Sequence, residues 1–181
     1  MEVVNKIRKY FFERDLNGRK QSIQVKRQSI SYSDAKTIGI FFTATEARAR
    51  SFSTDYAEEL RKKGKQVFLL GYTEEKVDTT DFAFKAFSKK ELNWAGVPRS
   101  SDLDSFLSRD LDILLVMDEE SMQLAEYVSI LSKAKFRIGT PNMSVEAYDL
   151  AFDAQNAEAL TERARKIESF TNNAFVTHDE I

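Results

Sequence analysis

Polar side chains that could do chemistry follow several apolar runs of this 181-residue chain. Three of the turns read TATE (residues 43–46), GYT (71–73) and GTPN (139–142). In a doubly wound sheet the ligand crevice lies beyond the carboxyl ends of the strands, so a small ligand would lie near Thr43, Thr45, Tyr72 and Asn142. The first turn has no glycine that would let backbone amides close on a phosphate. We therefore expect the two threonine hydroxyls to cap a helix rather than to hold an anion.

Carboxylates and the single histidine are weaker candidates for catalysis. Asp118-Glu119-Glu120 follows another apolar run, but no histidine lies in the body to complete a metal site. Adjacent carboxylates also suit the start of a helix, which is the role we expect for them. His178 lies in a polar tail with no fixed neighbour to orient it as a general base. The chain has no cysteine and no serine in a nucleophile elbow, so we expect no enzyme activity, catalytic residue, metal or cofactor.

The distribution of charge is the clearest sign of a binding role. Residues 1–37 hold nine of the 27 basic and four of the 29 acidic residues. The net charge is therefore +5 in this segment and −7 in the rest of the chain. Basic arms bind polyanions by counterion release or lie on anionic membranes. Tyr10, Phe11 and Phe12 interleave with the basic residues, as in extensions that contact RNA. The expected RNA-binding residues are Lys6, Arg8, Lys9, Arg14, Arg19, Lys20, Lys26 and Arg27.

Three interpretations of this arm stay open. In the first, a non-enzymatic, ribosome-associated protein is anchored on structured RNA, while its acidic body faces away or meets another protein. In the second, the arm lies on an anionic membrane surface. In the third, it is an amphipathic helix packed on its own domain.

Two further features could belong to a binding surface. Trp94, in a loop of turn residues, either stacks on a base or fills a partner's pocket, or else closes over the sheet edge as core. Lys133, Lys135 and Arg137 either share a surface with the arm or form a solvated helix end.

The elements that must position these residues follow from the apolar pattern. Buried runs predict strands at 38–42, 67–70, 82–87, 111–117, 136–138 and 148–152. Helical stripes lie between them, including one capped by Thr43 and Glu46 and ended by Gly64, one capped by Ser101 and Asp104, and a last one over 155–172. This alternation predicts a single Rossmann-like α/β domain with a mostly parallel sheet over 37–172.

The two ends of the chain flank this domain. Residues 1–36 form the basic arm, with a short helix ending near Asn17-Gly18 and an extended segment or edge strand after it. Residues 173–181 form a polar tail. No apolar run has the length of a membrane span, and no secretory signal is apparent, so we expect a cytoplasmic protein.

Two resemblances add to this interpretation. Segments 36–42, 60–65, 92–94 and 132–139 (KTIGIFF, LRKKGK, LNW and SKAKFRIG) resemble an uncharacterised family of Bacteroidota proteins over most of the chain. That family has no assigned activity, and the resemblance implies a basic N-terminal extension. Separately, LDILL (111–115) with 131–139 is similar to the N-terminal half of heptosyltransferase-type glycosyltransferases. Those enzymes use a second Rossmann-like domain to hold the sugar nucleotide, so the likeness implies the fold and, as an alternative function, a degenerate small-ligand domain.

Overall fold

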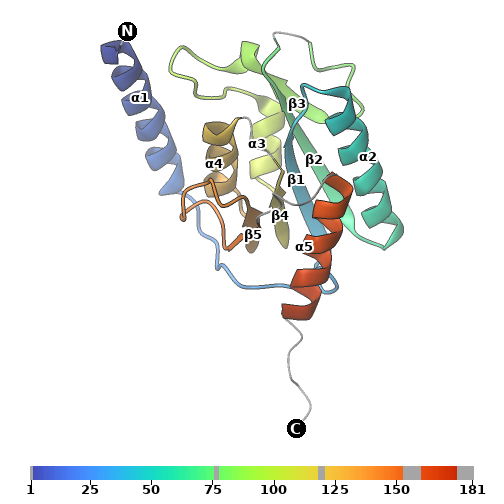
Figure 1. The fold of residues 1–181 in the computed structure, drawn as a ribbon. Coiled ribbons are helices and arrows are strands. Elements are labelled where there is room, and N and C mark those ends of the chain that lie inside the picture. Colours follow the sequence, from blue (N-terminus) through green and yellow to red (C-terminus); the bar gives the residue numbers. More distant parts are fainter. Residues whose placement is uncertain (1, 76–77, 118–120, 153–159, 175–181) are drawn as a thin grey trace.

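A six-stranded parallel sheet forms the centre of the molecule (Figure 1). The computed structural model describes residues 2–75, 78–117, 121–152 and 160–174. The strands are β1 Thr37–Thr43, β2 Gln66–Thr73, β3 Lys85–Ser88, β4 Ile113–Val116, β5 Phe136–Gly139 and β6 Leu150–Ala151. Their order is β3-β2-β1-β4-β5-β6, and each neighbouring pair is parallel. The predicted Rossmann-like α/β fold is therefore confirmed, with its topological switch point between β1 and β4.

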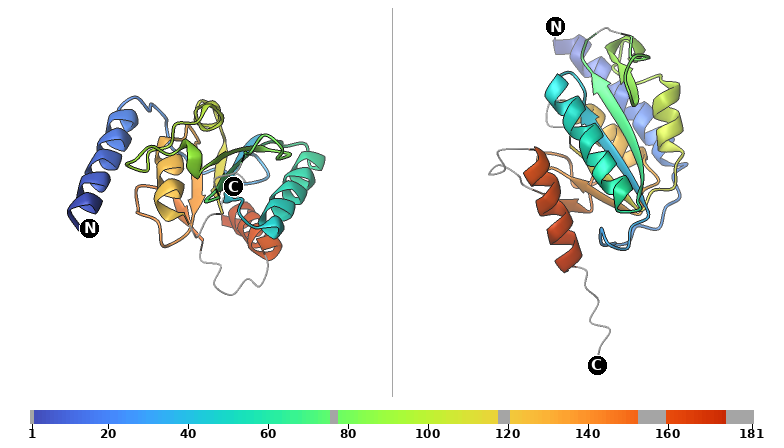
Figure 2. Two further views of the ribbon diagram at one scale, coloured as in Figure 1. Left: turned by 90° about the horizontal axis from the view of Figure 1, so that it is seen from above. Right: turned by 90° about the vertical axis from the view of Figure 1, so that its right-hand side faces the viewer.

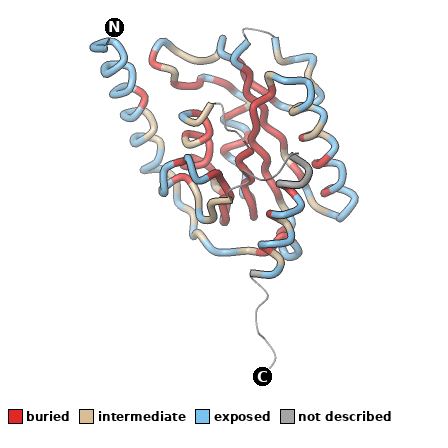
Figure 3. The backbone as a smooth tube through the Cα atoms, viewed as in Figure 1, coloured by how far each residue is buried: buried red, intermediate tan, exposed pale blue. Residues whose placement is uncertain are grey.

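Helices cover both faces of the sheet. They are α1 Glu2–Lys20, α2 Ala47–Lys62, α3 Ser101–Leu107, α4 Met122–Leu131 and α5 Leu160–Ala174. One face is covered by α2 and α5 and the other by α3 and α4, with α1 outside α4 at the edge of the molecule (Figures 1 and 2). Ile38 and Ile40 of β1 pack with the α2 side and Phe41 with the α3 side, so this strand is buried on both faces (Figure 3). Burial on both faces explains its unbroken apolar sequence.

Two helix starts differ from the prediction. Thr43 does not cap α2, because it is still part of β1 and stands opposite Tyr72 in the ladder. The N-cap of α2 is Glu46, and the N-cap of α3 is Ser100 rather than Ser101. The predicted end of α2 is confirmed, since Gly64 follows it with φ +81°, a conformation that glycine adopts without a steric cost.

The first 36 residues also differ from the prediction in detail. Helix α1 runs through Gly18 to Lys20, because Arg19 and Lys20 are held by contacts with the body. The segment 21–36 contains turns at 21–22 and 32–34 and belongs to none of the described strands, so the edge strand considered for it is wrong. The Gln28 N–H donates to the carbonyl of Lys135, the residue just before β5, at 3.0 Å.

Smaller differences lie at two other places. The strand predicted over 82–87 begins only at Lys85, because the rings of Phe82 and Phe84 pack over the sheet. The ring centroid of Phe84 lies 5.1 Å from that of Phe42. The last helix is observed as Leu160–Ala174. Asp118-Glu119-Glu120, His178 and tail residues 175–181, for which we made predictions, lie outside the described residues.

Candidate docking surface on the N-terminal helix

Helix α1 has two apolar faces. Phe12 and Leu16 face the body, where Phe12 is 3% exposed and its ring centroid lies 5.3 Å from that of Tyr127 in α4. Ile7 and Tyr10 lie on the opposite side, since residues of an α-helix are 100° apart around its axis. The inner face explains why the helix is docked. The outer face needs a separate explanation.

A hydrogen-bond network centred on Tyr127 fixes α1 to the body. The Tyr127 hydroxyl donates to Asp15 at 2.8 Å and accepts from Arg19 at 3.0 Å. Arg19 also pairs with Asp104 of α3 at 2.7 Å, and Asp15 pairs with Arg99 at 2.9 Å. Burial and the Asp15 carboxylate raise the pKa of Tyr127, so its hydroxyl stays a proton donor. The arm is therefore a packed part of the fold.

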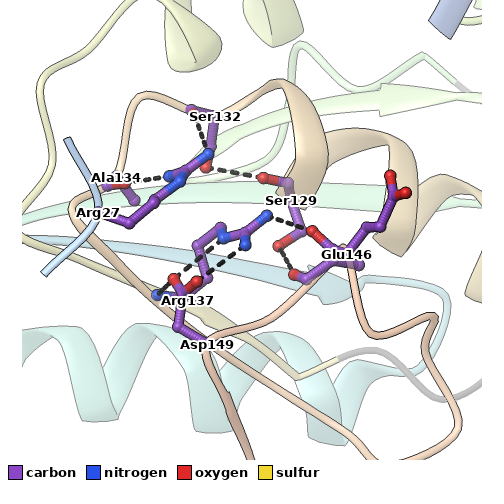
Figure 4. A network of polar contacts seen from close by, with 8 residues as sticks. Arg27, Ser129, Ser132, Ala134, Arg137, Glu146 and Asp149 are labelled. Carbon is purple, nitrogen blue, oxygen red and sulfur yellow. Dashed lines mark hydrogen bonds and ion pairs between the residues drawn. The ribbon is translucent and has the colours of Figure 1, made fainter. Parts of the chain in front are cut away.

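A second set of contacts holds the extended segment that follows α1. The guanidinium of Arg27 donates to the carbonyls of Ala134 and Ser132, close to Arg137 (Figure 4). Arg137 is itself buried and pairs with Asp149 at 2.9 Å. Burial, together with the charge of Arg137, lowers the pKa of Arg27 to about 10. Arg27 thus stays cationic at neutral pH but is used inside the fold.

Asp112 ties the end of this segment to the sheet. Its carboxylate accepts from the backbone N–H groups of Lys36 at 2.8 Å and Thr37 at 3.0 Å, and pairs with Lys135 at 2.7 Å. Burial acts to raise the pKa of Asp112, but Lys135 and the two N–H groups outweigh it and lower the pKa to about 2. Two of the three residues of the second basic cluster, Lys135 and Arg137, are thus bound by carboxylates of the fold.

The eight predicted RNA contacts fall into three groups. Three bind groups of the body, two pair with a glutamate four residues away on α1, and three have no carboxylate partner in the described part of the chain. The first group is Arg19, Lys20 and Arg27, the second is Lys6 and Lys9, and the third is Arg8, Arg14 and Lys26. Less positive charge is therefore free than the sequence count implies.

The outer face of α1 exposes a cluster of large apolar side chains. Ile7 is 45% exposed, Tyr10 59% and Trp94 57%, and the Trp94 ring lies edge-on to Phe11 with centroids 5.2 Å apart. Trp94 is not core, so that interpretation of its loop is wrong. We call the whole cluster the outer apolar surface. Its members are Val3, Val4, Ile7, Tyr10, Phe11 and Trp94.

The loop around Trp94 is held by its own hydrogen bonds. The side-chain oxygen of Asn93 accepts from the N–H groups of Ala95 at 2.9 Å and Val97 at 3.0 Å, and Gly96 has φ +83°. Asn93 closes the turn from inside, which leaves Trp94 to point outward. Beside it, a pocket of about 400 Å³ is lined by Phe11, Arg14, Trp94 and Arg99, among others.

The residues predicted for a small ligand are only partly brought together. Thr43 and Tyr72 are neighbours in the β1–β2 ladder. The hydroxyls of Thr43 and Thr45 are buried and have no hydrogen-bond partner among the described residues, so they do not cap α2. Arg50 instead donates to the Thr45 carbonyl at 2.7 Å and closes this turn. Asn142 is exposed and follows β5, which β4 separates from β1.

The described residues show neither a metal-binding cluster nor a membrane-spanning helix. They contain no group of three or more His, Asp or Glu side chains placed to hold a metal ion. None of the described helices is long and apolar enough to cross a bilayer.

Comparison with other proteins confirms membership in an uncharacterised family. No curated protein and no solved structure matches the chain. A family model does match, over residues 5–167, and so takes in α1 as well as the sheet. Because this match covers most of its length, the chain belongs to DUF6913, a family of unknown function.

Proposed function

We propose that this protein is a peripheral docking protein whose helix α1 lies on an anionic membrane surface. The outer apolar surface carries the proposal. Six of the eight large apolar side chains exposed in the described chain gather there, on a helix whose opposite face is already packed. Contiguous exposed apolar patches mark surfaces that a partner or a membrane covers.

The position of α1 suits a flat partner. The helix lies at one edge of the molecule, with the body on one side and open space on the other (Figure 2, left). Arg14, which lies on the same side of the helix as Ile7 and has no carboxylate partner among the described residues, would bind lipid phosphates. Tyr10 and Trp94 are residue types that favour the headgroup level of a bilayer. The acidic remainder of the chain would be repelled and stay off the surface.

RNA binding is a second candidate, favoured by the pocket beside Trp94. The rings of Phe11 and Trp94 in this pocket could stack on an unpaired base, and the guanidinium group of Arg14 could bind the adjoining phosphate. Association with ribosomes thus stays a prediction. It ranks second because it gives no role to Val3 and Ile7, and because three of the eight expected contacts are bound in the fold.

A small-ligand function stays a third, weaker prediction. The ligand would lie at the switch point between β1 and β4, near the hydroxyls of Thr43 and Thr45. The likeness to glycosyltransferases bears on this alternative alone, and a thermal shift with a sugar nucleotide would test it.

Cosedimentation with vesicles of phosphatidylcholine, with and without phosphatidylserine, tests the membrane proposal. Point variants are preferable to truncation, because Phe12 belongs to the core. Ile7→Glu should abolish vesicle binding. The matched control Phe170→Glu should not, because it alters an equally exposed apolar residue on α5, across the sheet from α1. Binding should need phosphatidylserine and weaken as salt rises.

Ribosomes and a structured RNA in the same assay separate the two candidates. If the chain sediments with RNA but with neither vesicle, and Ile7→Glu leaves this unchanged, the RNA prediction replaces the membrane proposal. If Ile7→Glu and Phe170→Glu bind vesicles equally well, the outer apolar surface is not the contact.

A further inference from the structure

We infer that the outer edge of β2 is a docking site for an extended peptide of a partner protein. Strand β3 pairs only with Leu70–Thr73, so the first half of β2 has a neighbour on its β1 side alone among the described strands. An edge of this kind can accept an added strand. The site lies on α2, β2 and α3, apart from α1, so it does not depend on the proposed membrane contact.

The directions of the backbone groups show which donors are open. The Gln66 N–H donates to the Lys36 carbonyl, and the Tyr72 carbonyl accepts from Ala44, so residues 66 and 72 face β1. Alternation along the strand then turns the N–H groups of Val67 and Leu69 to the outer side. Neither N–H has a hydrogen-bond partner in the described part of the chain. Two donors, two residues apart, match the carbonyls of an extended peptide.

A slot of the right shape lies against these donors. A cavity of about 340 Å³ is bounded by the edge of β2, by Thr54 and Arg61 of α2, and by Phe106 of α3. An extended segment placed there would be covered by a helix on each face. It would also continue the line of β3, because the chain before β3 leaves the edge where the Phe84 ring packs against Gly71.

The charges of the slot indicate what the peptide carries. Two of its cations are paired inside the site, Arg61 with Glu58 and Lys85 with Asp102. The guanidinium of Arg109 instead lies 4.0 Å from the centroid of the Phe68 ring. It has no carboxylate partner among the described residues. A stacked guanidinium with free N–H groups binds carboxylates well. The preferred peptide therefore combines β-branched residues with an acidic side chain that reaches Arg109.

One backbone group at this edge of β2 is already covered by a side chain. Arg61 donates to the outward carbonyl of Val67 at 3.0 Å, which blocks one acceptor. Charged side chains commonly guard sheet edges against self-association in this way. The two open N–H groups remain for a peptide that brings its own carbonyl groups.

A phage-displayed library of random heptapeptides, panned on the full chain, tests this inference. Enriched peptides should carry an acidic residue among β-branched ones. Hydrogen exchange at the Val67 and Leu69 amides should slow when a selected peptide binds. Arg109→Gln should weaken that peptide about three- to fivefold, as expected for a partly exposed ion pair, whereas the control Arg48→Gln on α2 should not.

Val67→Pro removes one outward donor without touching the β1 ladder, a position where edge strands tolerate proline. With its fold checked by circular dichroism, this variant should lose peptide binding. The inference is overturned if no peptide is enriched, or if enriched peptides bind wild type, Arg109→Gln and Val67→Pro alike. It is also overturned if both amides become protected with rising protein concentration alone, because a second copy would then occupy the edge.

Discussion

Replacing Phe12 with alanine should release α1 from the body without unfolding the sheet. Phe12 is the residue of α1 that is buried in the core, where it contacts Tyr127. It lies close to the edge of the molecule, beside a groove of about 1050 Å³ along α1. A helix held by so few buried groups can open as a separate unit.

The size of the effect follows from the burial of this ring. Deleting a buried Phe side chain destabilises a protein by about 3–5 kcal/mol, and the cost is smallest where neighbouring groups or water can fill the space left behind. Water from the adjoining groove can reach the space that Phe12 leaves, so we expect about 3 kcal/mol. At about 1.4 kcal/mol per factor of ten, the open form of α1 becomes more than a hundredfold more populated.

Native-state hydrogen exchange measures this directly. Amides of α1 should lose about two powers of ten of protection, while those of β1 and β4 keep theirs. Phe11→Ala is the matched control, because Phe11 is 41% exposed and makes one edge-on ring contact with Trp94, so its loss should lower the opening free energy of α1 by only about 1 kcal/mol. Equal losses in the two variants would refute the two-faced description of α1. A loss shared by β1 and β4 would make α1 part of one cooperative core.

Three further changes have defined outcomes. Because its pKa is lowered to about 2, Asp112 stabilises the fold above about pH 4, and this contribution is lost as pH falls towards 2. Asp112→Asn should cost about 1–2 kcal/mol at neutral pH, after allowance for solvent screening, and urea titrations should show the difference shrinking in acid. Tyr127→Phe leaves Asp15 without its hydroxyl donor and should cost about 1–2 kcal/mol in the same titration. Gly39→Ala puts a methyl group 2.5 Å from Leu111 and should cost about 1–3 kcal/mol, seen as a lower thermal midpoint.

The sheet could be predicted because burial on both faces leaves a strong mark on the sequence. The residues of β1 are apolar in succession, and only a strand covered on both sides needs that. Strand ends and helix caps were predicted less well. Thr43 and Glu46 have capping-box spacing, but pairing with β2 keeps Thr43 in the strand.

The role of the basic residues could not be predicted, because their partners are far away in the sequence. Arg19 binds Asp104 and Tyr127, which lie 85 and 108 positions along the chain. A count of charges does not separate cations that are paired inside a fold from cations that are free.

The two faces of α1 did leave a signal. Val3, Ile7 and Tyr10 follow helical spacing, and so do Phe12 and Leu16, on the other side of the helix. The inner and outer faces are not distinguished when all the aromatic residues of α1 are treated as one group. Only the structure shows that the stripe with fewer members is the packed one.

The hold of Arg27 on the loop before β5 sets how far α1 can travel. If the contacts around Tyr127 break while Arg27 keeps the Ala134 and Ser132 carbonyls, only residues 21–26 are released between helix and anchor. Six extended residues span about 20 Å. Helix α1 would therefore stay tethered to the body by this short segment. When α1 binds a surface, the sheet would lie within about 20 Å of that contact, and it could tilt but not move farther away.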